Sequence, residues 1–237
     1  MKNTPILLIA LLLLLGACDK NRTHKNSEGS TPGQHTQETG PFNELSLQGN
    51  YEVLLILADE PRVDIDASEE LLEHISISNS GGKLSIITDE DILQDDAIKI
   101  TVYYTDLDYI ICGGAATLRN EGFLKSHYLQ IDMQGAGLFE LDIETNTCDV
   151  EIAGAGIVRL RGNTNLIKCS IDGAGNLGAY DLFAQDADIR LSGVGGAQVT
   201  VEGTLDARVS GMGGIGYRGN PEKVNSQVSG LGAIFED

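Results

Sequence analysis

The sequence of 237 residues has no tryptophan, few other aromatic residues, and only 16 basic residues against 35 acidic ones, a formal net charge of −19. It therefore has no basic stripe that could neutralise phosphates, which disfavours nucleic acid as a partner. Its four cysteines match no zinc-ligand spacing, and it contains neither an EF-hand loop nor a Gly-Gly-x-Gly-x-Asp nonapeptide. We accordingly expect no metal or other cofactor.

The sequence also has no apolar run long enough to span a bilayer, and its longest apolar run lies near the N-terminus. Lys2 supplies a positive charge there, an apolar stretch runs from residue 6 to 15, and small residues precede Cys18. About ten apolar residues are too few to span a bilayer, so residues 1–17 are predicted to be a secretory signal peptide. The Leu15-Gly16-Ala17-Cys18 sequence resembles a bacterial lipoprotein box, which implies cleavage before Cys18 and its lipidation. An ordinary signal peptide with an incidental cysteine is the alternative.

Residues 18–41 differ in composition from the rest of the chain. They are rich in Asn, Ser, Thr, Gly, Gln, Lys and His and have almost no apolar side chains. Such a segment cannot bury enough apolar surface to order itself, so we predict a flexible tether after a lipidated Cys18. Residues 42–237 contain no linker-like stretch and are predicted to form one domain with a substantial core.

A short glycine motif recurs through the second half of the chain. The six Gly-x-Gly copies begin at residues 135, 154, 173, 193, 211 and 230, and a looser copy begins at Gly114. A repeat of about 19 residues is typical of a solenoid, in which each coil buries its apolar side only by stacking on its neighbours. Six near-equivalent copies favour a structural role for the glycines, as corners or as room for close packing, over a phosphate-binding loop.

Apolar residues take fixed places relative to the first glycine of each copy. They stand two residues before it, as in Met133 and Ile152, and one, four and six residues after it, as in Ala136, Phe139 and Leu141. We interpret these positions as inward-facing and the polar residues between them as outward-facing. The sequence therefore predicts an all-β protein, a right-handed parallel β-helix of about 19-residue coils with two to three short strands each.

The first half of the predicted domain, from Phe42 onward, also alternates but is less regular. Asn79-Ser80-Gly81-Gly82 lies between two alternating segments and predicts a hairpin or tight corner. Residues 68–74 predict one helical turn capped by Ser68. We expect this half to provide wider coils or strands that cap the stack, because an open end would expose unpaired backbone groups.

The repeated copies, for example Ile171-Asp172-Gly173-Ala174-Gly175 and Val209-Ser210-Gly211-Met212-Gly213, resemble the head GIN domain family of auto-transporter adhesins. The similarity covers roughly residues 42–237. It implies a β-helix-like fold, a cell-envelope location and an adhesin label, and it brings no catalytic residues. The acidic residue that typically follows Gly-Ala-Gly in the family is absent, because Leu138, Ile157 and Asn176 stand there. This departure weakens any idea of an ion site at the corner.

The candidate ligand surface is formed by outward residues Arg159, Arg161 and Tyr180, which could bind a sugar through stacking and hydrogen bonds. A polysaccharide-cleaving β-helix would need clustered carboxylates or a base-like Arg or Lys in a groove, and the outward columns form a mixed surface with one aromatic residue and no repeated acid pair. We therefore expect no catalytic residues and no enzyme. Acidic clusters at residues 64–70 and 89–96 could hold calcium, but solvated loops are the simpler interpretation.

Three hypotheses for the function remain open. The first is a lipid-anchored envelope lipoprotein, placed in the outer membrane with its face unassigned, that presents a non-catalytic surface for adhesion or ligand binding. The second is a carbohydrate-binding or polysaccharide-cleaving protein on the same scaffold. The third is a scaffold for other envelope proteins. Cys112, Cys148 and Cys169 fall at inward positions and are predicted to be buried thiols. An oxidising envelope would permit a disulfide between Cys148 and Cys169, but we expect the two residues to be too far apart for an undistorted one.

Overall fold

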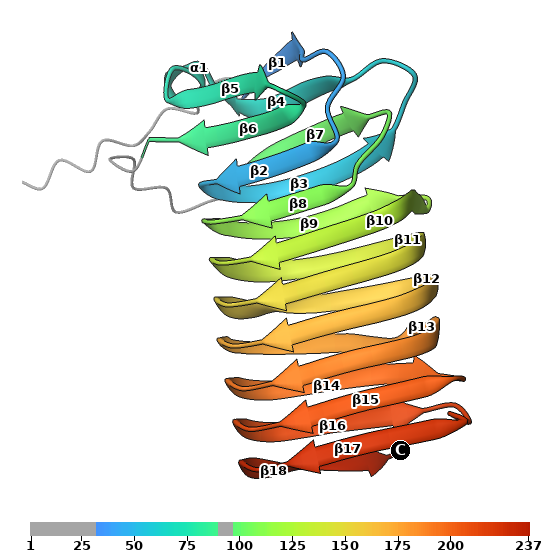
Figure 1. Ribbon diagram of the computed structural model, residues 1–237. Helices are drawn as coiled ribbons and strands as arrows, with labels where there is room; N and C mark the ends of the chain where they lie inside the picture. The colour runs from blue at the N-terminus through green and yellow to red at the C-terminus, as the bar shows by residue number, and fades with distance from the viewer. Residues whose placement is uncertain (1–31, 90–96) are drawn as a thin grey trace, which may run out of the picture. The chain divides into compact units, whose positions relative to one another are not determined.

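A computed structural model describes residues 32–89 and 97–237, and nearly all of its elements are strands (Figure 1). The only helix among these residues is α1 (Glu69–Leu72). The strands are β1 (Pro32–Glu38), β2 (Glu44–Gln48), β3 (Asn50–Leu57), β4 (Arg62–Ser68), β5 (Ile75–Ser80), β6 (Lys83–Thr88), β7 (Ile98–Tyr104), β8 (Tyr109–Cys112), β9 (Ala115–Glu121), β10 (Leu124–Met133), β11 (Ala136–Ile152), β12 (Ala155–Ile171), β13 (Ala174–Leu191), β14 (Val194–Val201), β15 (Thr204–Val209), β16 (Met212–Arg218), β17 (Lys223–Val228) and β18 (Leu231–Glu236).

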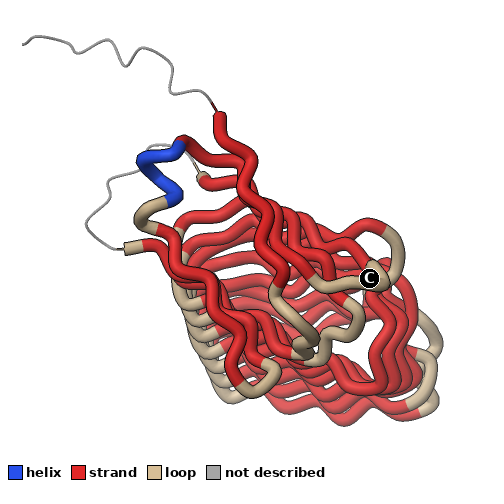
Figure 2. The backbone as a smooth tube through the Cα atoms, turned by 90° about the horizontal axis from the view of Figure 1, so that it is seen from above, coloured by secondary structure: helices blue, strands red, loops and turns tan. Residues whose placement is uncertain are grey.

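The strands form two walls of a β-solenoid. The first wall has the order β1-β4-β7-β3-β9-β11-β12-β13-β14-β16-β18, and the second has the order β5-β6-β2-β8-β10-β11-β12-β13-β15-β17. Strands β11, β12 and β13 each bend and contribute to both walls. From β9 and β10 onward all pairings are parallel, and partners in β11 and β12 are 19 residues apart. Figure 2 shows successive coils lying over one another. The predicted parallel β-helix is confirmed.

The predicted strand length per coil is wrong for the central coils. We expected two to three short strands, but β11 and β12 have 17 residues each and β13 has 18. The backbone keeps its ladder bonds through the bend because each coil follows the curve of the coil below it.

The inward positions two before and four and six after the first glycine are confirmed. Met133, Phe139 and Leu141 are buried, as are their counterparts in the following coils up to β16, except Tyr217, which is partly buried against the core. The position one after the glycine was wrongly assigned inward. Val194 and Met212 are half-exposed there, and Leu231 is 77% exposed. The alternation of strand residues explains the difference. Inward positions recur every second residue from Met133, so they include both glycines of the copy, Gly135 and Gly137, while Ala136 between them faces outward.

Close packing explains the first glycine of every copy. A Cβ atom at Gly135 or Gly154 would lie 1.8 Å from the carbonyl oxygen of the first glycine in the preceding coil, and the next four copies give 2.0 or 2.1 Å. None of these six residues has a left-handed backbone. The second glycine of a copy has a left-handed backbone in three of the six copies, with φ values of 155° at Gly137, 144° at Gly195 and 136° at Gly213. Close packing restricts this position too, since a Cβ atom at Gly195 would lie 1.8 Å from the Gly175 carbonyl oxygen. The first glycine of a copy therefore serves close packing, and the second serves close packing together with, in three copies, a left-handed backbone.

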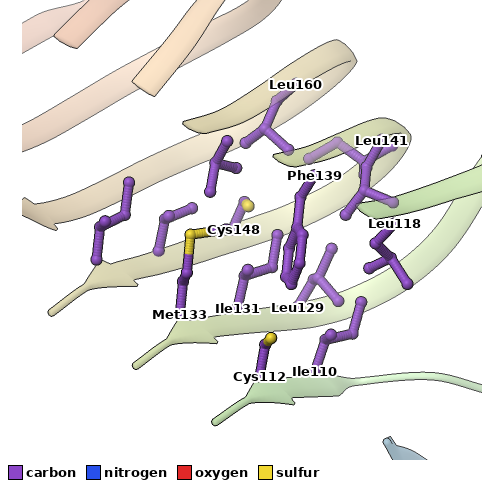
Figure 3. Packing of buried hydrophobic residues seen from close by; sticks show 14 of the residues in the cluster. Ile110, Cys112, Leu118, Leu129, Ile131, Met133, Phe139, Leu141, Cys148 and Leu160 are labelled. Atoms are coloured by element: carbon purple, nitrogen blue, oxygen red, sulfur yellow. The ribbon is translucent and has the colours of Figure 1, made fainter. Parts of the chain in front are cut away.

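The core is one continuous column of side chains between the walls (Figure 3). Its three cysteines are buried and free, as predicted. Cys148 pairs in the ladder with Ile167, two residues from Cys169, so the two thiols lie in different columns of neighbouring coils. Burial raises the pKa of the Cys112 thiol to about 11 and raises those of Cys148 and Cys169 further. These thiols are therefore protonated components of the core at neutral pH.

The N-terminal region caps the stack, as predicted. Strands β5 and β6 form an antiparallel hairpin whose turn, Gly81-Gly82, has φ values of 63° and 87°. The Ser68 side chain accepts a hydrogen bond from the backbone N–H of Leu71 at the start of α1. Leu71, Leu72, Ile75 and Ile77 pack against the end of the core.

The folded region begins earlier than predicted. The tether was expected to continue to residue 41, but β1 covers Pro32–Glu38 and pairs antiparallel with β4. A polar segment can form such an edge strand because the ladder bonds come from its backbone, and Gln37 adds a side-chain bond to the Ile77 carbonyl. The predicted signal peptide, Cys18, the first part of the tether and most of the acidic cluster at 89–96 lie outside the described residues.

Candidate functional site

The outer face of the first wall carries two regular columns of outward residues in the C-terminal half of the solenoid. The first column is Leu138, Ile157, Asn176, Gly196, Gly214 and Ala233, and the second is Glu140, Arg159, Gly178, Gln198, Gly216 and Phe235. Several coils have glycine in these columns where others have a side chain. The result is an open depression of about 470 Å³, here called the glycine depression, which includes all of these residues from β12 onward except Ala233.

Phe235 forms one end of the glycine depression. Its ring lies against two glycines of β16, since Cβ atoms built on Gly214 and Gly216 would each lie 3.2 Å from a ring carbon. The side chain is nevertheless 49% exposed. Glycine at these two positions therefore lets an aromatic ring lie close to the backbone while part of its surface faces solvent.

A cluster around Tyr180 forms the rim beside Phe235. The Tyr180 hydroxyl lies against Gly216, and the Arg218 guanidinium lies 3.9 Å from the centre of the Tyr180 ring. Arg218 also donates a 2.8 Å hydrogen bond to Asp237. Burial and the nearby Asp237 carboxylate raise the pKa of Tyr180, so its hydroxyl stays protonated at neutral pH.

The position of Tyr180 depends on an extra residue in β13. The ladder between β12 and β13 pairs Arg159 with Gly178 but Arg161 with Asp181, which is a β-bulge. The copy that begins at Gly173 is 20 residues long, one more than its two predecessors. Bulges redirect side chains from regular columns, and this one turns Tyr180 toward the coils that follow.

At the other end of the glycine depression, three charged side chains form an ion-pair network. Glu140 accepts hydrogen bonds from Arg119 at 2.8 Å and from Arg159 at 2.9 Å. These two bonds lower the pKa of Glu140 below its ordinary value. Because its charge is matched by Glu140, Arg159 adds hydrogen-bonding groups to the glycine depression without an unpaired positive charge.

The Glu140 network predicts a pH-dependent contribution to stability. A carboxyl whose pKa is lower in the folded state contributes at pH values above its unfolded pKa, and the contribution disappears as the pH falls through the lowered value. We expect Glu140→Gln to destabilise the protein by about 1 kcal/mol or less at pH 7, since both arginines are half-exposed. Urea unfolding at pH 7 and pH 3 should show a smaller difference from wild type at pH 3.

Asp142→Asn provides the matched control, because this carboxylate is on the same strand and its nearest guanidinium, that of Arg161, is 3.8 Å away. It should change stability less than Glu140→Gln at pH 7. Equal effects of the two substitutions at both pH values would contradict a specific role for the Glu140 bonds.

The three residues predicted as a ligand surface have different positions. Arg159 lines the glycine depression, and Tyr180 lies at its rim under Arg218. Arg161 pairs with Asp142 and does not line the depression. The sequence interpretation missed Asn176 and Phe235 as contributors to this surface. The sequence feature that could have indicated them is the glycine found at four outward positions, Gly178, Gly196, Gly214 and Gly216. This feature is visible only when the outward positions of successive coils are compared with one another.

A second depression of about 390 Å³ lies at the N-terminal end of the same outer face, among β3, β4, β7 and β9. Its lining is strongly charged, with Glu52, Asp64 and Asp66 opposite Lys99 and Arg119. In the part of the chain that the structure describes, no group of three or more His, Cys, Asp or Glu side chains is arranged to hold a metal ion.

A regular β-solenoid presents an open depression whose lining contains no Asp or Glu, and so lacks the carboxylate pair of a glycoside hydrolase. No helix among the described residues is long and apolar enough to cross a membrane.

Residues 41–221 match the model of the family described as "Putative auto-transporter adhesin, head GIN domain". The chain belongs to this family, which confirms the resemblance found in the repeats and indicates an envelope-associated protein. Among curated protein sequences, none matches the chain.

Solved structures show the same fold. A putative adhesin from Bacteroides fragilis NCTC 9343 has a TM-score of 0.83 and 20% sequence identity, with 88% of this chain and 98% of that chain covered. A putative adhesin from Parabacteroides distasonis ATCC 8503 has a TM-score of 0.66 and 16% identity, with coverage of 88% and 98%. A putative lipid binding protein from the same organism has a TM-score of 0.64 and 19% identity, with coverage of 86% and 97%.

Proposed function

We propose that the protein is a lipid-anchored lipoprotein of the outer membrane that presents the outer face of the first wall for adhesion, without catalysis. The observation that carries the proposal is the glycine depression, an open hollow with an exposed aromatic ring and exposed amides but no lining carboxylate. Family membership and the adhesin names of two structural neighbours support the same function.

The anchor is the lipidated Cys18 that the lipoprotein-box sequence predicts. Lipid attachment at the N-terminus would place the cap of the solenoid toward the membrane and leave the glycine depression, built from the C-terminal coils, further away. Such an arrangement suits an adhesin, because its ligands approach from the side opposite the bilayer.

Replacement of Cys18 tests the anchor. Wild-type protein expressed in a Gram-negative host with a lipoprotein pathway should incorporate labelled palmitate and sediment with outer membranes. The Cys18→Ser variant should lose both the label and sedimentation, whereas the neighbouring control Asn21→Ser should keep them. A Cys18→Ser variant that remains labelled and membrane-bound would refute lipidation at this residue.

Adhesion itself is tested with cells that carry or lack the gene, on surfaces coated separately with polysaccharides, matrix proteins and envelope proteins of neighbouring bacteria. Carrier cells should adhere more strongly to at least one coating, and equal adhesion to all coatings would refute the adhesin proposal. Release of reducing ends or unsaturated sugars by the purified chain would refute the absence of catalysis and favour the polysaccharide-cleaving alternative. Adhesion to envelope proteins alone would favour the scaffold alternative.

A further inference from the structure

Resting on the proposed adhesive function, we infer that the glycine depression binds a neutral saccharide that lies across successive coils, between Arg159 and Phe235. Four features of the depression favour such a ligand: the charge of its lining, its exposed aromatic ring, its planar polar groups and its length.

The lining indicates an uncharged ligand. Among the residues of the glycine depression, Arg159 alone is charged, and its guanidinium donates a 2.9 Å hydrogen bond to Glu140. No unpaired lining charge is left to bind an acidic sugar, and the protein as a whole has a formal net charge of −19, which repels anions. The second depression on this face contrasts with it, since five charged residues line that site.

Phe235 supplies an apolar surface on which a sugar ring can pack. One side of a pyranose ring consists largely of C–H groups, which pack on the face of an aromatic ring. Gly214 and Gly216 hold Phe235 close to the sheet, and about half of the side chain remains exposed. The site therefore contains a fixed stacking platform, for which little side-chain freedom is lost when a ligand binds.

Polar groups lie beside this platform in the remaining part of the depression. Asn176 and Gln198 are exposed and belong to neighbouring coils, and their amides carry both donors and acceptors. The guanidinium of Arg159 adds further donors. Planar groups that donate and accept side by side match the adjacent hydroxyls of a sugar, which also do both.

The depression is long enough for several sugar units. Arg159 and Phe235 are four ladder steps apart, on β12 and β18, which corresponds to roughly 19 Å at the usual strand spacing. Gly178 and Gly196 leave the path between them open. We therefore expect an oligosaccharide or a segment of a polysaccharide to bind better than a monosaccharide.

Gly178→Leu is the sharpest test, because it fills the depression without backbone strain. A Cβ atom at Gly178 would lie 3.5 Å from Arg159 Cγ, an ordinary contact, and the backbone there is not left-handed. Gly113→Leu is the matched control: its Cβ would lie 3.6 Å from Gln48 Cγ, and the residue is remote from the depression in the ladder. Phe235→Ala removes the stacking platform as an independent second variant.

The purified full chain should first be applied to an array of neutral and acidic glycans, and then titrated with cellohexaose, maltohexaose and chitohexaose by calorimetry. We expect saturable binding of a neutral glycan, weakened at least tenfold by Gly178→Leu and by Phe235→Ala and unchanged by Gly113→Leu. The melting temperatures of the three variants should stay close to that of wild type.

Two outcomes would overturn the inference. One is the absence of any neutral glycan bound by the array and the hexasaccharides, and the other is equal binding by all three variants and wild type. Neither result would refute the adhesive function, because cells can still adhere to protein-coated surfaces in the assay described above. Loss of adhesion to every coating, in contrast, would refute the function on which the inference rests.

Discussion

Replacing Gly154 with alanine is expected to destabilise the protein by about 4 kcal/mol or more, one of the largest effects available to a single methyl group. The added Cβ would lie 1.8 Å from the carbonyl oxygen of Gly135 and 2.4 Å from that of Gln134. Both atoms belong to backbone of the neighbouring coil, which no rotamer change can move. The coils would have to separate locally, with loss of the hydrogen bond from Ala155 N–H to the Gly135 carbonyl.

Gly178→Ala provides the control for this prediction. Gly178 lies on the outer face of the next coil, where the added Cβ meets Arg159 Cγ at 3.5 Å. Because glycine loses more backbone entropy on folding than alanine, this substitution should be neutral or stabilising by about 0.4–1 kcal/mol. Urea unfolding followed by far-ultraviolet circular dichroism measures both variants. A Gly154→Ala variant as stable as Gly178→Ala would show that the coils can move apart at low cost.

Truncation of Phe139 is expected to destabilise the protein by about 3–5 kcal/mol. The ring is completely buried in the column between Leu118 and Val158, its partners in the coils on either side (Figure 3). Removing it leaves a cavity in the continuous core, and the ladders fix the strands around that cavity. Since backbone pairing prevents the walls from collapsing inward, we expect a value near the upper end of this range.

Phe183→Ala is the matched control, because Phe183 is 58% exposed on the bulged strand β13. It should change the free energy of unfolding by no more than about 0.5 kcal/mol. Thermal and urea unfolding of both variants test the difference. Equal destabilisation by the two substitutions would contradict the assignment of Phe139 to a tightly packed core.

Much of the fold could be predicted because one coil repeats. The spacing of the glycines and the apolar residues at positions such as Met133 and Phe139 is sufficient to define parallel coils with an interior. The Gly81-Gly82 hairpin and the Ser68 cap could also be predicted, since both depend on local backbone chemistry. Strand β1 could not, because its polar side chains carry no strand pattern and its stability comes from pairing with β4.

The candidate site was only partly visible in the sequence. Arg159 and Tyr180 were selected as outward polar and aromatic residues, but the same argument selected Arg161, which pairs with Asp142 away from the depression. Asn176 and Phe235 were not predicted, because the depression exists only where four glycines in three coils replace outward side chains. Alternation along one strand cannot show such a feature, which exists only between neighbouring strands.

The sequence by itself determined the repeat, three of the four predicted inward columns and the parallel stacking, because a 19-residue coil with one apolar side has no other way to bury it. It also contains the lipoprotein-box cysteine on which the proposed anchor depends. The tertiary structure alone decided which glycines serve close packing, which side of the wall is hollow and which residues meet there. The physical reason is that these properties depend on distances between coils: the carbonyl of Gly135 restricts Gly154, and the glycines of β16 leave the space that Phe235 occupies.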